Sequence, residues 1–98
     1  MSKFTFKNGR LPGEVMRDVA VREKALRKSR HLTQRQLAER ASVSLGSLRR
    51  FDQTGQVSFD SLVAIAFALG CESQLDALFV KPAYSSIQEV IADARKAR

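Results

Sequence analysis

The sequence predicts an all-α fold, and three observations lead to that prediction. Helix-forming residues continue without a break from about residue 14 to residue 30. Residues 33–36 and 86–89 each have the spacing of a capping box, in which the first and fourth residues bond each other's backbone N–H groups. Gly55 and Gly70 follow segments of helical pattern, at positions where helices commonly end. A chain of 98 residues has the length of one domain, so a single small helical domain is expected.

Composition excludes several classes of protein. The chain has 17 Lys and Arg against ten Asp and Glu, a formal net charge of +7, and a sequence pI near 10.3. A hydrophobic fraction of 44% is enough for a core, so a disordered basic tail cannot be the whole protein. With one cysteine, Cys71, and one histidine, His31, we expect neither a disulfide framework nor a metal site, and no cofactor.

The sequence predicts neither a membrane-spanning helix nor a signal peptide. The longest apolar run, residues 62–69, is shorter than the ~18 residues that a membrane span needs. The first seven residues lack the apolar stretch of a signal peptide. We therefore expect a cytoplasmic protein without a membrane partner.

The residue types at the start and end of each helical segment predict where the helices begin and end. Pro12 suits the start of a long helix over about residues 14–30, whose apolar stripe includes Val15, Val19 and Leu26. The helix should end at His31 in a left-handed turn, and we interpret this histidine as a helix stop rather than a ligand or a catalytic base.

Three capped helices follow. Thr33 caps a short helix that ends at Ala41, and Ser44 caps a second that runs to about Gln53. Ser58 caps a third, which ends at Gly70. A further short helix is expected over residues 72–79, then an extended stretch over 80–84 and a final helix over 86–98.

Residues 34–51 have the spacing of a helix-turn-helix. The inner faces of its two helices are apolar, and Val43 fills the turn between them. The inner-face residues are Leu37, Ala38, Ala41, Leu48 and Phe51. The exposed start of the second helix carries Ser44, Leu45, Gly46, Ser47, Arg49 and Arg50. A recognition helix presents such N-terminal residues to base edges in the major groove.

The basic charge is concentrated where this motif lies. Residues 1–55 hold 13 Lys and Arg against five Asp and Glu, a net charge of +8, whereas residues 56–98 carry −1. A basic excess can be merely a solvated surface, or it can face a polyanion, of which nucleic acid is the commonest. We favour the second interpretation because the motif lies inside the basic half.

Residues 31–51, read as HLTQRQLAERASVSLGSLRRF, resemble the XRE/Cro-type helix-turn-helix regulators. The resemblance covers about residues 22–79 and implies a five-helix Cro/repressor-like domain. Residues 44–51, followed by Thr54 and Gly55, resemble more narrowly the HipB-like antitoxins, which are encoded beside HipA-type kinase toxins. The expected organisation is an N-terminal arm or short strand over 1–11, a helix-turn-helix DNA-binding domain over 12–79, and an extended segment with an extra C-terminal helix over 80–98.

The resemblance implies roles for single residues. Gln34 matches the family's phosphate-binding glutamine, and Arg35 and Thr54 are further expected phosphate contacts. The base-reading positions are Ser44, Leu45, Gly46, Ser47, Arg49 and Arg50. Of these, Arg50 or Arg49 is the expected bidentate contact to guanine, worth ~1–3 kcal/mol of discrimination. Arg27 and Asp52 match a pair that ties the first helix to the end of the recognition helix.

Two positions depart from the family pattern. Ser42 stands where the family usually has glycine in the turn, and a left-handed serine is less comfortable there. Gly46 leaves a gap on the reading face, so specificity is expected to depend on few side chains and on DNA shape.

The helix over residues 58–69 is apolar nearly all round, and a domain of this size has too little interior to bury every face of it. We expect a homodimer interface there or with residues 78–84. Phe4 and Phe6 could form a strand that pairs with this extended segment. Alternatively, Lys3, Lys7 and Arg10 could act as a basic arm on DNA; the residues leave both open.

The functional expectation is a sequence-specific repressor, not an enzyme. It would bind a palindromic operator as a homodimer and regulate its own toxin–antitoxin operon as the antitoxin. The alternative is an antitoxin that neutralises a kinase toxin by binding, with little DNA-reading role. No nucleophile, His/carboxylate pair or Gly-rich phosphate loop suggests catalysis.

Overall fold

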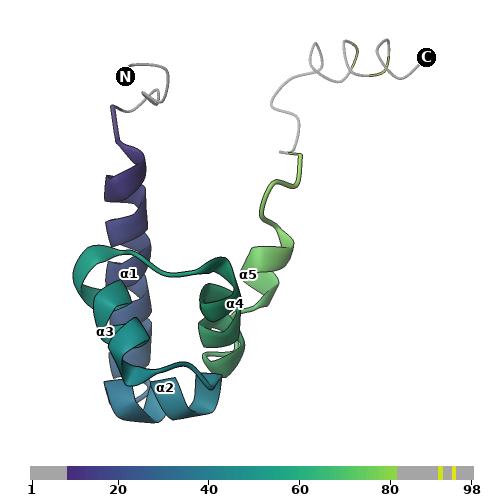
Figure 1. Cartoon of the computed structure of the whole chain (residues 1–98). Coiled ribbons are helices and arrows are strands. Elements are labelled where there is room, and N and C mark those ends of the chain that lie inside the picture. Colours follow the sequence, from purple (N-terminus) through teal and green to yellow (C-terminus); the bar gives the residue numbers. More distant parts are fainter. Residues whose placement is uncertain (1–8, 82–90, 92–93, 95–98) are drawn as a thin grey trace.

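The computed structural model describes residues 9–81 together with Ile91 and Ala94. Over these residues the chain is all helical, with no strand, which confirms the all-α prediction. Five helices follow one another (Figure 1): α1 (Pro12–Ser29), α2 (Gln34–Ala41), α3 (Leu45–Thr54), α4 (Phe59–Ala68) and α5 (Ser73–Asp76). The expected strand around Phe4 and Phe6 lies outside the described residues, as does the final helix over 86–98 apart from Ile91 and Ala94, which are helical.

Local hydrogen bonds begin the helices where the sequence predicts. Thr33 accepts a bond from the Gln36 backbone N–H at 3.1 Å, and the Gln36 side chain accepts one from Thr33 N–H at 2.9 Å, so the predicted capping box is confirmed. The hydroxyl of Ser44 accepts from Ser47 N–H at 3.0 Å and begins α3. The hydroxyl of Ser58 begins α4 in the same way.

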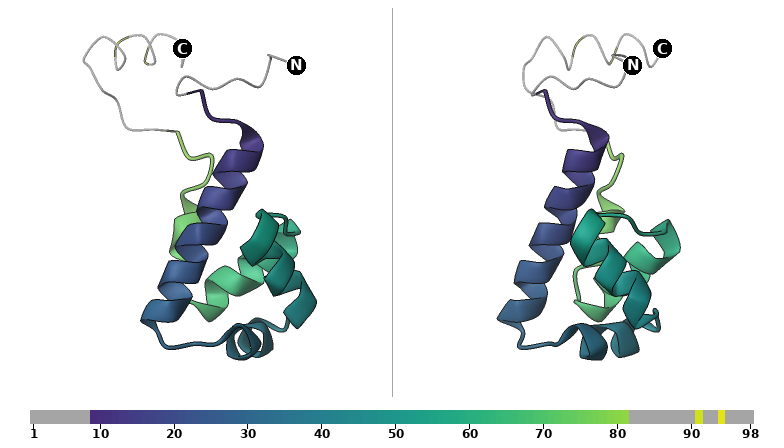
Figure 2. Two further views of the ribbon diagram at one scale, coloured as in Figure 1. Left: turned by 90° about the vertical axis from the view of Figure 1, so that its left-hand side faces the viewer. Right: turned by 60° about the vertical axis from the view of Figure 1, so that its left-hand side comes forward.

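The helices pack around one apolar core. α1 lies against α3, α3 against α2, and α2 against α4, while the N-terminal part of α1 extends past the other helices (Figures 1 and 2). The core consists of Ala20, Leu32, Leu37, Ala38, Ala41, Leu48, Phe51, Ile65 and Leu69. The inner faces expected for residues 34–51 are therefore the faces that are buried.

A residue in the left-handed conformation follows the end of each of α1, α2 and α3. His31 has a φ of 58°, as expected for a helix stop, and Ser42 has a φ of 56° in the turn between α2 and α3. Gly55, at the end of α3, has a φ of 80° and packs against the backbone of α1. A Cβ atom on Gly55 would lie 2.7 Å from the carbonyl carbon of Met16, so this position requires glycine for space as well as for conformation.

Two expectations about the helices are wrong. The helix expected over residues 72–79 is limited to α5, because residues 77–79 form turns and Phe79 takes a left-handed φ of 64° that cannot continue a helix. On α1, Val15 is 38% exposed, whereas Glu23 and Arg27 are buried. Val19 and Leu26 pack against the core as expected, so the face of α1 that meets the core contains them together with Glu23 and Arg27.

None of the helices in the described part of the chain has both the length and the apolar character needed to cross a bilayer.

Candidate nucleic-acid interface

α2 and α3 form a compact pair joined by three residues. In the turn, the backbone N–H of Ser42 donates to the Glu39 carbonyl at 3.2 Å, and that of Val43 donates to the Ala38 carbonyl at 3.0 Å. Val43 is half-buried and packs against the core. These contacts close the end of α2 and set the direction in which α3 leaves it.

α3 has two contrasting faces. Leu48 and Phe51 are at most 1% exposed and point into the core. Five of the six predicted base-reading residues are exposed on or beside the first two turns: Ser44, Gly46, Ser47, Arg49 and Arg50. The sixth, Leu45, is half-buried and packs against the core, so part of its side chain has a structural role.

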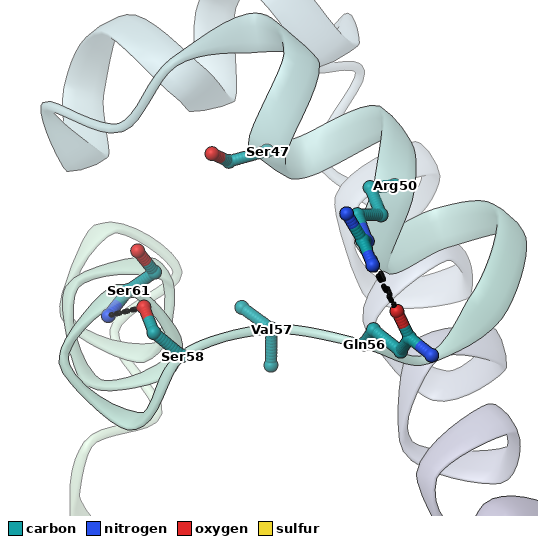
Figure 3. A pocket seen from close by; sticks show the side chains of 6 residues that line it. All are labelled: Ser47, Arg50, Gln56, Val57, Ser58 and Ser61. Atoms are coloured by element: carbon teal, nitrogen blue, oxygen red, sulfur yellow. Dashed lines mark hydrogen bonds between the residues drawn. The ribbon is translucent and has the colours of Figure 1, made fainter.

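The two arginines of α3 have different surroundings. The guanidinium of Arg50 donates to the Gln56 side-chain oxygen from Nε at 3.0 Å and also from Nη2 (Figure 3). Arg49 has no hydrogen bond or ion pair with any described residue. Gln56, which the sequence analysis did not single out, therefore orients Arg50, and only its closeness in sequence to the end of α3 could have pointed to it.

Two of the three expected phosphate contacts have intramolecular partners. Gln34 is half-buried at the first position of α2, and its Nε2 donates to Asp52 Oδ2 at 2.8 Å. The hydroxyl of Thr54 donates to the Arg50 carbonyl at 2.7 Å and accepts from Gln56 N–H at 3.1 Å, so it closes the end of α3. Arg35 is exposed next to Gln34.

A buried charged network connects α1, α2 and α3. The expected partners Arg27 and Asp52 form an ion pair, with 3.3 Å between Nη2 and Oδ2. Arg27 also donates from Nη1 to the Leu32 carbonyl at 3.0 Å. Because Asp52 accepts from Gln34 as well, one carboxylate holds the start of α2 and the end of α3 to α1.

Glu23 belongs to the same network, although it is not among the site residues predicted from the sequence. Its side chain lies one turn before Arg27, with 3.5 Å between Oε2 and Arg27 Nε. Burial, followed by the neighbouring carboxyl of Asp52, raises the pKa of Glu23 to about 8 although Arg27 acts in the opposite direction. The spacing of Ala20, Glu23 and Arg27 at i, i+3 and i+7 was the available signal, since it places all three on one helix face.

A polar hollow of about 390 Å³ adjoins the exposed face of α3 (Figure 3). It is lined by Ser47, Arg50, Gln56, Val57, Ser58 and Ser61. At the α4 end of this hollow the Asp60 carboxylate accepts bonds from Ser58 Oγ at 2.6 Å and from Ser61 N–H at 2.9 Å. These bonds lower the pKa of Asp60, so an internal carboxylate already occupies the N-terminus of α4.

Within residues 9–81, no three His, Cys, Asp or Glu side chains lie together in a way that could hold a metal ion. What the site offers is hydrogen-bond donors and positive charge on one exposed helix face. A scan against models of known protein families finds no match to the chain, and a search of curated protein sequences finds none either.

Proposed function

We propose that this chain is a sequence-specific DNA-binding repressor whose α3 enters the major groove of double-stranded DNA. One observation carries the proposal: α3 exposes hydroxyl and guanidinium groups along its first turns while its opposite face is buried in the core. A major groove about 12 Å wide admits one such helix, and arginine and serine side chains are suited to its donor and acceptor groups.

The distribution of positive charge also supports the proposal. Exposed basic side chains lie at the C-terminal end of α1, on α2 and on α3: Lys28, Arg30, Arg35, Arg40, Arg49 and Arg50. Phosphate neutralisation by such residues supplies most non-specific affinity for DNA and makes it fall with salt. A family resemblance in residues 31–51 and a net charge of +8 over residues 1–55 agree with this proposal.

The contacts at both ends of α3 also support the proposal, because they hold this helix rigidly. The Ser44 cap begins the helix, Gly55 ends it against α1, and the buried Arg27–Asp52 pair fastens its last turn. A helix fixed at both ends loses little conformational entropy when it enters a groove, which favours affinity.

We further propose that the protein acts as a homodimer through the apolar surface of α4 and the residues after α5. Phe59 and Phe67 of α4 are 64% and 63% exposed, and Phe79 is 97% exposed between exposed Leu78 and Val80. Exposed apolar groups in such number mark an interaction surface. To bind a palindromic operator, such a two-fold dimer must present its two copies of α3 to half-sites about 34–36 Å apart.

DNA binding is tested by fluorescence anisotropy, with a labelled duplex from upstream of the gene and a shuffled duplex of equal composition. We expect tighter binding to the first at physiological salt, and equal affinity for both would overturn the repressor proposal. Arg50→Ala should cost ~1–3 kcal/mol and relax the preference at one base pair, whereas Gln34→Ala should weaken all sites alike. Arg22→Ala is the matched control, because Arg22 is an exposed arginine of α1 with no hydrogen bond or ion pair to the described residues of α3.

The dimer is tested by analytical ultracentrifugation. Phe67→Asp should shift the protein toward monomer, because a carboxylate would be buried in an apolar interface. Val21→Asp is the control, since Val21 is 60% exposed on α1 and outside the proposed surface. If wild type sediments as a monomer at the concentrations used for DNA binding, this part of the proposal is lost.

A further inference from the structure

Two carboxyl groups and one guanidinium are buried together where α1 meets α3. Glu23, Arg27 and Asp52 are 7%, 6% and 8% exposed. Arg27 lies between the two acids, 3.5 Å from Glu23 through Nε and 3.3 Å from Asp52 through Nη2. With both acids ionised, the cluster would hold a net charge of −1 away from water, which a low-dielectric interior disfavours strongly.

The hydrogen bonds of the cluster leave a place for one proton. Asp52 Oδ2 accepts from Arg27 and from Gln34, but its Oδ1 has no hydrogen-bond partner. Both carboxyl oxygens of Glu23 are likewise buried without a hydrogen-bond partner. Since ionised carboxylates only accept, two of them cannot satisfy each other, whereas a protonated carboxyl can donate to a neighbouring carboxylate.

We propose that Glu23 is a positioning residue that enters the fold as a neutral acid and donates its proton to Asp52, so that one proton completes the network holding α3 against α1. The cluster then carries one positive and one negative charge and is neutral overall. The proton comes from solvent during folding and returns to solvent when Glu23 ionises.

The environment of Glu23 is consistent with this assignment. The charged groups that face it are Arg27 on its own helix and Asp52 on α3, and the group that α2 contributes to the network is the neutral amide of Gln34. Burial and Asp52 raise the pKa of Glu23 to about 8, from an ordinary value of 4.5. An acid whose pKa is raised on folding gives stability that is fully present below its unfolded value and is lost as the pH rises through its folded value. The window of declining stability therefore runs from about pH 4.5 to about pH 8.

The test is the unfolding equilibrium in urea, measured from about pH 5 to about pH 8 on wild type and Glu23→Gln. A glutamine amide can donate to Asp52 as the neutral acid does, but it does not titrate. For wild type we expect the unfolding constant to rise by up to about tenfold per pH unit inside the window, and for the variant we expect that rise to disappear. Glu39→Gln, an exposed acid of α2, should keep the wild-type slope.

A direct measurement of the Glu23 carboxyl in wild type tests the proposal even if Glu23→Gln does not fold. Carboxyl ¹³C NMR of wild type should show one glutamate that titrates several pH units above the other glutamates, and Glu23→Gln should lack that signal if it folds. The proposal is overturned if every glutamate carboxyl titrates at ordinary values, or if wild type and Glu23→Gln lose stability in parallel as pH rises.

One consequence rests on the proposed function. If α3 is the DNA-reading helix, wild type and Glu23→Gln should bind the upstream duplex equally at about pH 6, and wild type should bind several-fold more weakly than the variant at about pH 8.5. Failure of both proteins to distinguish DNA sequences at any pH would contradict the repressor proposal alone. Equal affinities for the duplex at high pH, with the unfolding slope present, would restrict the role of Glu23 to the fold.

Discussion

Replacing Gly55 with alanine tests whether the close approach of α3 to α1 holds the interface in place. The added Cβ would lie 2.7 Å from Met16 C, 2.8 Å from Arg17 N and 2.9 Å from Met16 O, all backbone atoms that cannot rotate away. The residue would also have to keep a φ of 80°. A left-handed conformation costs a residue with a Cβ ~1–2 kcal/mol, and overpacking adds ~1–3 kcal/mol.

We therefore expect Gly55→Ala to lower the free energy of unfolding by about 2–4 kcal/mol, after a small gain from the less flexible unfolded chain. This is a large share of the ~5–15 kcal/mol that holds an ordinary domain together. Urea unfolding followed by far-UV circular dichroism measures the change. Because α1 must move away from α3, amide hydrogen exchange should rise in both helices.

Gly46→Ala is the matched control. Gly46 lies inside α3, nothing approaches its added Cβ within 4 Å, and its φ is not in the left-handed region. Alanine there should stabilise the protein by ~0.5–1 kcal/mol through helix propensity. If the two variants shift stability by the same amount, or Gly55→Ala costs less than about 0.5 kcal/mol, the argument from close packing is refuted.

Other substitutions probe the turn, the α4 cap and the core. Ser42→Gly should stabilise the fold by ~0.5–1 kcal/mol in urea unfolding, because it removes the Cβ from a left-handed residue; a loss of stability would contradict this account of the turn. The lowered pKa of Asp60 means that its ionised form contributes stability present above the unfolded value and lost as pH falls through the folded one. Asp60→Asn should therefore lose less stability than wild type on acidification below about pH 3.8, and an unchanged acid profile would count against the cap. Phe51→Ala should cost ~3–5 kcal/mol, since Phe51 is 1% exposed; a cost below about 1 kcal/mol would mean that the core collapses around the cavity.

The beginnings of α2, α3 and α4 were predictable because their causes lie within a few residues. The hydroxyls of Thr33, Ser44 and Ser58 each bond a backbone N–H three residues along the chain, and no distant segment is needed for that bond. The end of α5 was not predictable in this way. Residues 72–79 contain good helix formers, and the turns that interrupt them became visible only with the left-handed Phe79.

The exposed residues of the candidate interface were predictable from the apolar period of residues 34–51, but their partners were not. Gln34 was expected to reach outward, and it donates instead to Asp52, 18 positions further along the chain. Arg50 was expected to be available to a base, and it is held by Gln56. Hydrogen-bond partners of long side chains depend on which loops come near them, and periodicity carries no information about that.

By itself, the sequence determined the helical class, the capped beginnings of three helices, the left-handed position of His31, and a basic first half. These follow from interactions within a turn or from composition. Tertiary structure alone decided that Glu23 is buried beside Asp52, 29 positions away, and that Gly55 touches the backbone of α1. The physical reason is that burial of a charge and exclusion of a Cβ are properties of two surfaces in contact, and they arise only when α1 and α3 meet.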